Sequence, residues 1–111
     1  MREIKFRAWS KLLNKMLSHE DLNKTLKNLT KIEYIAGIFL PLNSDVEVMQ
    51  YTGLKDSNGN EIYEGDIVEF YSNVEDEIIT EKVEYHFGIY RAGDYFVGKI
   101  YNKCKVIGNI Y

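Results

Sequence analysis

Residues that form tight turns divide the second half of the chain into short segments, and this pattern restricts the fold more than any other feature. Asn58-Gly59, Gly65-Asp66 and Arg91-Ala92-Gly93-Asp94 separate segments in which apolar and polar residues alternate. Alternation with a period of two is typical of half-buried β-strands. Short strands between such turns predict a small barrel or an open roll.

The positions of these strands follow from the apolar residues between the turns. Strands are expected at residues 46–51, 67–71 and 95–100, and the partner of the second is expected within residues 78–87, after an acidic loop at 73–77. Residues 106–111 close the chain. Asn58-Gly59 is predicted to form a two-residue hairpin turn, because both residue types tolerate the positive φ of a type I′ turn.

The first part of the chain mixes both kinds of periodicity. Residues 2–9 alternate, with Ile4, Phe6 and Ala8 on one face and Trp9 on the other, and Met16 and Leu17 begin a returning strand. Leucines spaced four and three residues apart predict a helix over 19–30. The period returns to two at residues 31–39, which predicts another strand.

Length and charge fit one soluble domain with two unlike parts. The 111 residues form a single expected domain, 1–111, with a strand and helix part at 1–45 and a barrel part at 46–111. Residues 1–31 hold eight Lys or Arg against three acids, a charge of +5, and residues 32–111 hold six against fourteen, a charge of −8. Such segments attract each other, either within one chain or between copies.

The sequence lacks the usual arrangements of catalytic and metal-binding residues. Cys104 is the only cysteine and is expected to be a small buried residue. His19-Glu20-Asp21 do not converge on a helix, and Asp56 to Glu61 depart from the calcium-loop pattern. His86 is expected to be an ordinary strand residue. The prediction is a protein that is not an enzyme and has no cofactor and no metal.

The chain carries no sign of export or membrane insertion. No apolar run is long enough for a membrane span, and no signal-peptide pattern follows Met1. We therefore expect a cytoplasmic location and no membrane partner.

Three stretches resemble the YopX family, whose members are small proteins found mostly in bacteriophages and prophages. The central stretch runs from Gln50 to Val68 and reads QYTGLKDSNGNEIYEGDIV; the others are Arg2 to Trp9 and Val106 to Tyr111. The resemblance implies a mainly β fold with an SH3-like small barrel in the C-terminal half, and the N-terminal strand and helix as an elaboration of it. It also implies expression in a bacterial host cell. It implies no defined activity.

Binding is the favoured function. The leading hypothesis is a phage- or prophage-encoded accessory or structural protein that forms a homo-oligomer and binds an unknown phage or host protein. Tyrosine provides rigid contact area at interfaces, and the candidate interface residues are Trp9, Tyr51, Tyr63 and Glu64. Turn formation and core packing explain the whole central motif without a partner, and this structural explanation is the favoured one for these residues.

Two other functions are open. One is a nucleic-acid-associated module that uses the basic N-terminal segment, although nine acids and only Lys82 as a base occur in residues 61–86. The other is a small enzyme or small-molecule binder, which would need polar groups that converge in a deep pocket.

Overall fold

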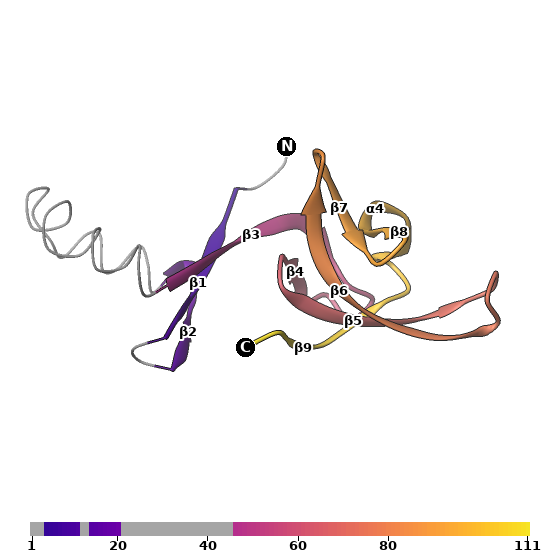
Figure 1. Ribbon diagram of the computed structural model, residues 1–111, viewed down its shortest axis with the longest axis horizontal. Coiled ribbons are helices and arrows are strands. Elements are labelled where there is room, and N and C mark those ends of the chain that lie inside the picture. Colours follow the sequence, from indigo (N-terminus) through magenta and orange to yellow (C-terminus); the bar gives the residue numbers. More distant parts are fainter. Residues whose placement is uncertain (1–3, 12–13, 21–45) are drawn as a thin grey trace, which may run out of the picture. The chain divides into compact units, whose positions relative to one another are not determined.

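The structure is a computed structural model that describes residues 4–11, 14–20 and 46–111. The chain is mainly β, and it divides into two compact units, one of residues 5–50 and one built mainly of residues 51–111. The division falls within strand β3 (Val46–Lys55), whose first half pairs in one unit and whose second half pairs in the other (Figure 1).

The unit of residues 5–50 contains a small antiparallel sheet. Strand β1 (Phe6–Ser10) pairs on one side with β2 (Lys15–Leu17) and on the other with the first half of β3. The strand expected at 2–9 and the return at Met16 are therefore present. Of the predicted apolar face, only Ala8 is buried; Ile4 precedes β1 and is exposed, and Phe6 is also exposed.

Most of the predicted N-terminal helix falls outside the described residues. His19 and Glu20 are helical, which agrees with the expected start at residue 19. The rest of the helix at 19–30 and the predicted strand at 31–39 fall in residues 21–45.

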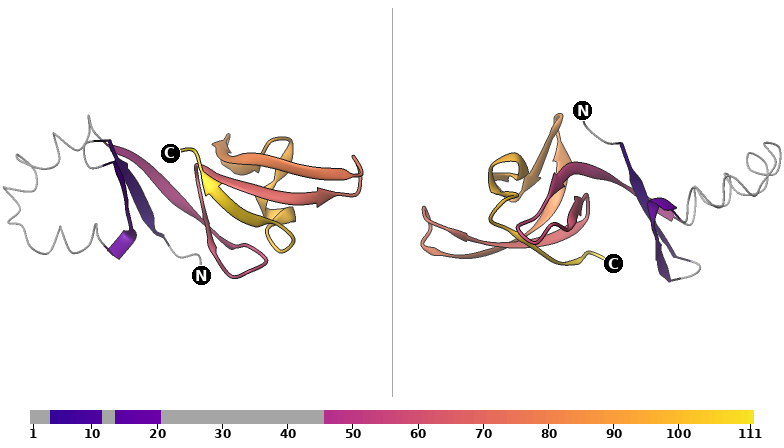
Figure 2. Two further views of the ribbon diagram at one scale, coloured as in Figure 1. Left: turned by 90° about the horizontal axis from the view of Figure 1, so that it is seen from below. Right: turned by 180° about the vertical axis from the view of Figure 1, so that it is seen from behind.

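The unit of residues 51–111 is a curled antiparallel sheet that forms half a barrel. Five strands pair in the order β8-β7-β6-β5-β9. Figure 2 shows from two further directions that the β5–β6 hairpin curves along its length. The elements of this unit are β4 (Glu61–Tyr63), β5 (Asp66–Ser72), β6 (Glu77–His86), β7 (Ile89–Ala92), β8 (Tyr95–Phe96), α4 (Val97–Ile100) and β9 (Lys105–Asn109).

Alternation along β5 explains why this sheet has one buried face. Val68 and Phe70 point inward and are buried, whereas the alternate residues Ile67 and Glu69 are partly exposed. Removal of such side chains from water is the main stabilising contribution to a fold of this kind. The core consists of Ile62, Val68, Phe70, Val83, Ala92, Val97, Ile100 and Cys104.

The central hairpin is present, but its turn differs from the prediction. The β3–β4 connection consists of the five residues 56–60, and it is closed by bonds from Asp56 N–H to the Asn60 carbonyl (2.8 Å) and from Gly59 N–H to the Asp56 carbonyl (3.0 Å). Gly59 has a φ of +85°, whereas Asn58 does not have a positive φ. The prediction of a two-residue type I′ turn at Asn58-Gly59 is therefore wrong. The Asp56 carboxylate explains the wider loop, because it accepts bonds from the N–H groups of Asn58 and Asn60.

The strand predicted at 95–100 is also wrong in its second half. After the two residues of β8, the chain enters the single helical turn of α4, which places Val97 and Ile100 together in the core. The N–H groups of Lys103 and Cys104 both donate to the Ile100 carbonyl at 3.0 Å. A short apolar segment of this kind fits either a strand or a helical turn by its periodicity alone.

Candidate functional site

The tip of the β6–β7 hairpin carries an aromatic residue in an unusual backbone conformation. His86 pairs with Ile89, so Phe87 and Gly88 form a two-residue turn, and their φ angles are +50° and +83°. Two successive positive φ angles are the geometry of a type I′ hairpin turn. Glycine adopts it freely, whereas a bulky residue such as phenylalanine is strained there. The Phe87 side chain is also 98% exposed.

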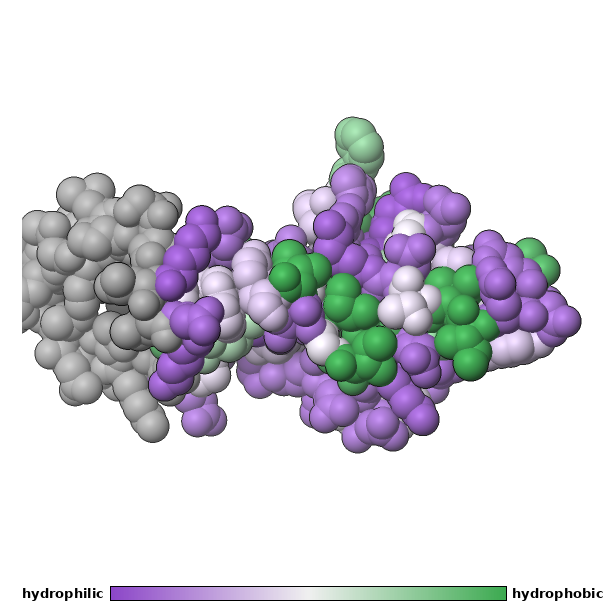
Figure 3. Space-filling model, turned by 60° about the horizontal axis from the view of Figure 1, so that its bottom comes forward, coloured by the Kyte–Doolittle hydropathy of each residue, from purple (hydrophilic) through white to green (hydrophobic). Residues whose placement is uncertain are grey.

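Exposed apolar residues continue next to this tip. Tyr85 is 51% exposed and Ile89 is 46% exposed. The rings of Tyr85 and Tyr90 pack edge to face with centroids 4.9 Å apart, an aromatic contact that stabilises the pairing of β6 with β7. Figure 3 shows a face of the molecule on which apolar side chains interrupt the hydrophilic surface.

Charged side chains follow the outer face of β6. Val83 points into the core, so alternation places Lys82, Glu84 and His86 on the opposite face. The Glu84 carboxylate lies 2.7 Å from Lys82 Nζ and 2.5 Å from His86 Nε2. The bond from Lys82, and then that from His86, lower the pKa of Glu84 to about 2. The same bond to Glu84 raises the pKa of Lys82.

Arg91 lies opposite Glu84 in the strand register but does not bind it. Its guanidinium carbon lies 5.7 Å from the centre of the Phe96 ring, a cation–π arrangement between paired residues of β7 and β8. Its Nε atom is buried and has no hydrogen-bond partner. Among the described residues, no carboxylate forms an ion pair with this arginine.

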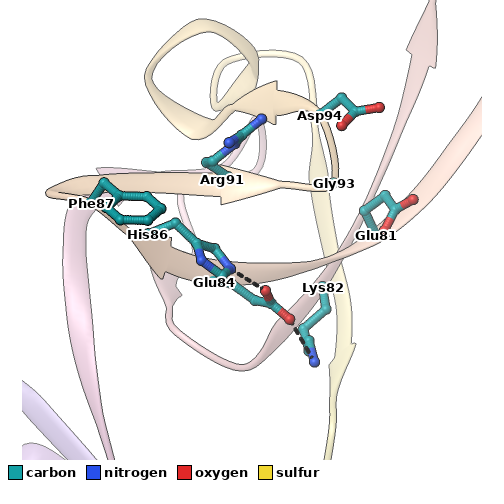
Figure 4. Close-up of a pocket in the computed structure, with 8 residues that line it drawn as sticks. All are labelled: Glu81, Lys82, Glu84, His86, Phe87, Arg91, Gly93 and Asp94. Carbon is teal, nitrogen blue, oxygen red and sulfur yellow. Dashed lines mark hydrogen bonds and ion pairs between the residues drawn. The ribbon is translucent and has the colours of Figure 1, made fainter.

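These side chains surround an open hollow of about 330 Å³. Figure 4 shows Phe87 at the hairpin end of the hollow, with Arg91 on one side and the row of His86, Glu84 and Lys82 on the other. Glu81 and Asp94 lie at the opposite end, where the Glu81 side chain packs against Gly93. The lining residues are Glu81, Lys82, Glu84, His86, Phe87, Arg91, Gly93 and Asp94.

The volume and the side chains define what this hollow can hold. Ligand pockets have volumes of about 300–1,000 Å³, so the hollow is large enough for one aromatic side chain. It offers an aromatic wall, a guanidinium and three carboxylates. This combination is suited to noncovalent binding of an apolar ring with polar groups around it.

The predicted interface residues fall into two groups. Tyr51 and Tyr63 are 3% and 7% exposed, and their rings pack together with centroids 5.4 Å apart. Trp9 in β1 and Glu64 after β4 are each partly exposed. Trp9 and Glu64 therefore keep part of their surface exposed, whereas the two tyrosines are buried within the chain.

The other residues that the sequence suggested as candidates for catalysis or metal binding make contacts that stabilise the fold. Cys104 is fully buried, as expected, and its burial, together with the charge of Asp56, raises the pKa of the thiol to about 11. In the calcium-like stretch, the Asp56 carboxylate accepts hydrogen bonds from the backbone N–H groups of Asn58, Asn60 and Val106. His86 is half-exposed and binds Glu84. Within residues 4–11, 14–20 and 46–111, no three acidic, histidine or cysteine side chains form a group that could hold a metal.

Phe87 and Arg91 were not among the residues that the sequence predicted for a functional site. The segment 78–87, predicted to contain a strand, included Phe87, although β6 ends at His86. A signal was present, because Phe87-Gly88 separates two alternating segments by two residues. Arg91 became a candidate only when the register placed it beside Phe96.

One further property concerns membranes. Among the residues that the structure describes, no helix has the length and apolar character required to cross one.

Comparison with solved structures supports the fold. The crystal structure of protein EF1440 from Enterococcus faecalis matches with a TM-score of 0.64 and 23% sequence identity, over 99% of this chain and 94% of that one. No curated protein matches the sequence. The family model described as YopX protein matches residues 5–111, which include the central Gln50 to Val68 stretch. The chain therefore belongs to the YopX family.

Proposed function

We propose that this chain is a phage- or prophage-encoded accessory or structural protein that works by binding rather than by catalysis. It forms a homo-oligomer in the cytoplasm of a bacterial host cell and binds a phage or host protein. Within this proposal, residues 46–111 are an SH3-like barrel, and residues 1–45 are its strand and helix elaboration.

The observation that carries the proposal is the exposed aromatic tip of the β6–β7 hairpin. Phe87 is 98% exposed and has a positive φ. Both features cost free energy in an isolated chain: a phenylalanine ring in water loses the benefit of burial, and its backbone is strained. A binding site recovers the first cost when a partner covers the ring, and aromatic residues are common anchors of protein interfaces.

The charges around the tip favour a protein partner over a nucleic acid. The hollow holds three carboxylates against Lys82, Arg91 and a histidine. Nucleic-acid affinity comes mainly from neutralising phosphates with lysine and arginine. The three carboxylates oppose this attraction, whereas protein interfaces commonly combine both signs of charge.

Mass measurement in solution tests the assembly part of the proposal. Light scattering at micromolar concentration is expected to give a multiple of the 13.0 kDa chain mass. A mass near 13.0 kDa over the whole concentration range would overturn self-assembly. Trp9→Ala is the variant for the interface predicted from the sequence, and it is expected to lower the mass if that residue anchors the assembly.

Capture from bacteria carrying the phage or prophage tests the partner. Tagged protein is expected to retain a defined phage or host protein in stoichiometric amount, and Glu64→Gln tests whether the predicted surface at Glu64 contributes. The binding proposal fails if nothing is retained above the level of an unrelated tagged protein of similar charge.

A further inference from the structure

We propose that the hollow beside the β6–β7 hairpin is one half of a symmetric contact, in which Phe87 of a second copy of this chain fills it and packs against Arg91. This inference deepens the proposed self-assembly by naming its interface. The site is incomplete in a single copy, because the ring that fills it comes from the other.

The argument begins with the position of the tip and the hollow. The hollow is lined by residues of the same hairpin and by Gly93 and Asp94, which directly follow β7, and Phe87 forms one end of the hollow without filling it (Figure 4). Most soluble oligomers have a two-fold axis, and across it the same patch on two copies faces itself. An axis that crosses this patch places each Phe87 over the hollow of the other copy.

The Arg91 guanidinium can pack against a second aromatic ring. The Phe96 ring already lies 5.7 Å from its guanidinium carbon, and no ion pair draws it away among the described residues. A guanidinium is planar, so one face can lie on Phe96 while the other accepts a second ring. Its cross-strand neighbour Glu84 is occupied by Lys82 and His86, which leaves the arginine available for this contact.

When a two-fold axis relates two copies of the patch, polar groups of one copy face complementary groups of the other. Phe87 and His86 lie at one end of the hollow, and Glu81 and Asp94 lie at the other (Figure 4). A two-fold axis brings the first end of one copy to the second end of the other. The carboxylates then face the imidazole of His86, and Ile89, which pairs with His86 and so lies on the same face of the sheet, adds apolar surface beside the inserted rings. This complementarity favours a second copy over an unrelated partner.

The first test uses Phe87→Asn. Asparagine tolerates positive φ, so this change removes the ring and relaxes the turn. Sedimentation equilibrium of the full chain is expected to give a dimer dissociation constant at least about tenfold higher than that of the original protein, since a central aromatic anchor is a binding hot spot. At concentrations where both proteins are monomeric, the variant is expected to melt at a higher temperature. A merely structural role of Phe87 would not produce these opposite effects.

A matched control and a complementation experiment make the test specific. Val74 is 90% exposed at the tip of the neighbouring β5–β6 hairpin, so Val74→Asn removes a comparable apolar tip and is expected to leave the mass unchanged. Arg91→Met is expected to weaken dimerisation about three- to tenfold through loss of the cation–π contact. A mixture of Phe87→Asn and Arg91→Met chains restores one intact contact per pair, so the mixed dimer is expected to be tighter than the Phe87→Asn dimer, which has none.

The outcomes distinguish failure of this interface from failure of the proposed self-assembly. If the unmodified protein is monomeric, both self-assembly and this contact are wrong. If it assembles but Phe87→Asn has the same mass, self-assembly stands and the hollow is not the interface; Trp9→Ala then identifies the alternative. If Phe87→Asn loses capture of a different protein while its mass is unchanged, the tip serves that partner and the symmetric contact is overturned.

Discussion

The Asp56 carboxylate accepts a 2.9 Å hydrogen bond from the backbone N–H of Val106, which lies fifty positions later in the chain. The other carboxylate oxygen accepts bonds of 2.9 and 2.8 Å from the N–H groups of Asn58 and Asn60. One buried side chain thus shapes the central loop and joins it to β9. Burial raises the pKa of this carboxyl, but the bonds from Val106, Asn60 and Asn58 outweigh it, and the pKa is lowered overall.

Asp56→Asn is therefore expected to destabilise the fold. The amide replaces one accepting oxygen with a donor, which leaves a backbone N–H group without its partner at a cost of about 1–3 kcal/mol. Because the folded-state pKa is lowered, the contribution of the ionised carboxylate is complete above the ordinary value of 3.8 and is lost as the pH falls through the folded value. Urea unfolding at pH 7 and at decreasing pH measures both effects, and the difference from the original protein should narrow in acid.

Glu75→Gln is the matched control for that experiment, because the Glu75 side chain is exposed at the β5–β6 tip. It is expected to change stability by less than about 0.5 kcal/mol. Equal destabilisation by both variants would show that Asp56 has no special role.

Gly59→Val is expected to destabilise the fold by about 1–3 kcal/mol through backbone strain alone. Gly59 has a φ of +85°, and no heavy atom lies within 4 Å of the position of an added Cβ atom, so no steric clash contributes. Gly98→Ala is the comparison, because Gly98 has open space and no positive φ and lies in α4. It is expected to stabilise by about 0.5–1 kcal/mol. Thermal unfolding of the two variants should shift in opposite directions.

The Cys104 thiol is expected to be unreactive in the folded protein. With a pKa of about 11, only about one thiol in ten thousand is ionised at pH 7, and the thiolate is the reactive form. A thiol reagent should therefore label the protein at the rate of unfolding, and denaturant should accelerate the labelling. Cys104→Ala should cost about 0.5–3 kcal/mol of stability. Rapid labelling under native conditions would contradict the burial of this side chain.

Glu84 is expected to remain ionised between the ordinary pKa of 4.5 and its own pKa of about 2. Its pKa of about 2 lies below the ordinary 4.5, so the carboxylate stabilises the fold above pH 4.5, and this contribution is lost as the pH falls towards 2. Carbon NMR of the side-chain carboxyl measures the titration directly. Lys82→Met removes the largest cause and should raise the midpoint, whereas Lys99→Met, on the exposed side of α4, should leave it unchanged.

The regular strands were predictable because alternation records which face of each strand is buried. β5 and β6 lie close to the segments expected at 67–71 and 78–87. The positive φ angles of Gly53 and Gly65 also agree with the freedom that their residue type suggests. In these segments the local pattern and the packing demand the same structure.

The remaining features depend on contacts that no local pattern contains. The width of the central loop depends on where the Asp56 carboxylate finds N–H groups, including that of Val106. The type I′ turn occurs at Phe87-Gly88 and not at Asn58-Gly59, because the pairing of His86 with Ile89 fixes a two-residue connection. Arg91 joins the hollow only through the register that sets it beside Phe96.

The pairing of β9 with β5 has a consequence for the order of folding. β5, β6 and β7 are joined by short turns, whereas Asp66 pairs with Asn109, and the Ile110 N–H donates to the Gly65 carbonyl at 2.9 Å. Bringing Asp66 and Asn109 together closes a loop of more than forty residues, and this loses chain entropy before the hydrogen bonds of the pair can form. We therefore expect the meander to form before β9 docks, because its strands are neighbours in the sequence.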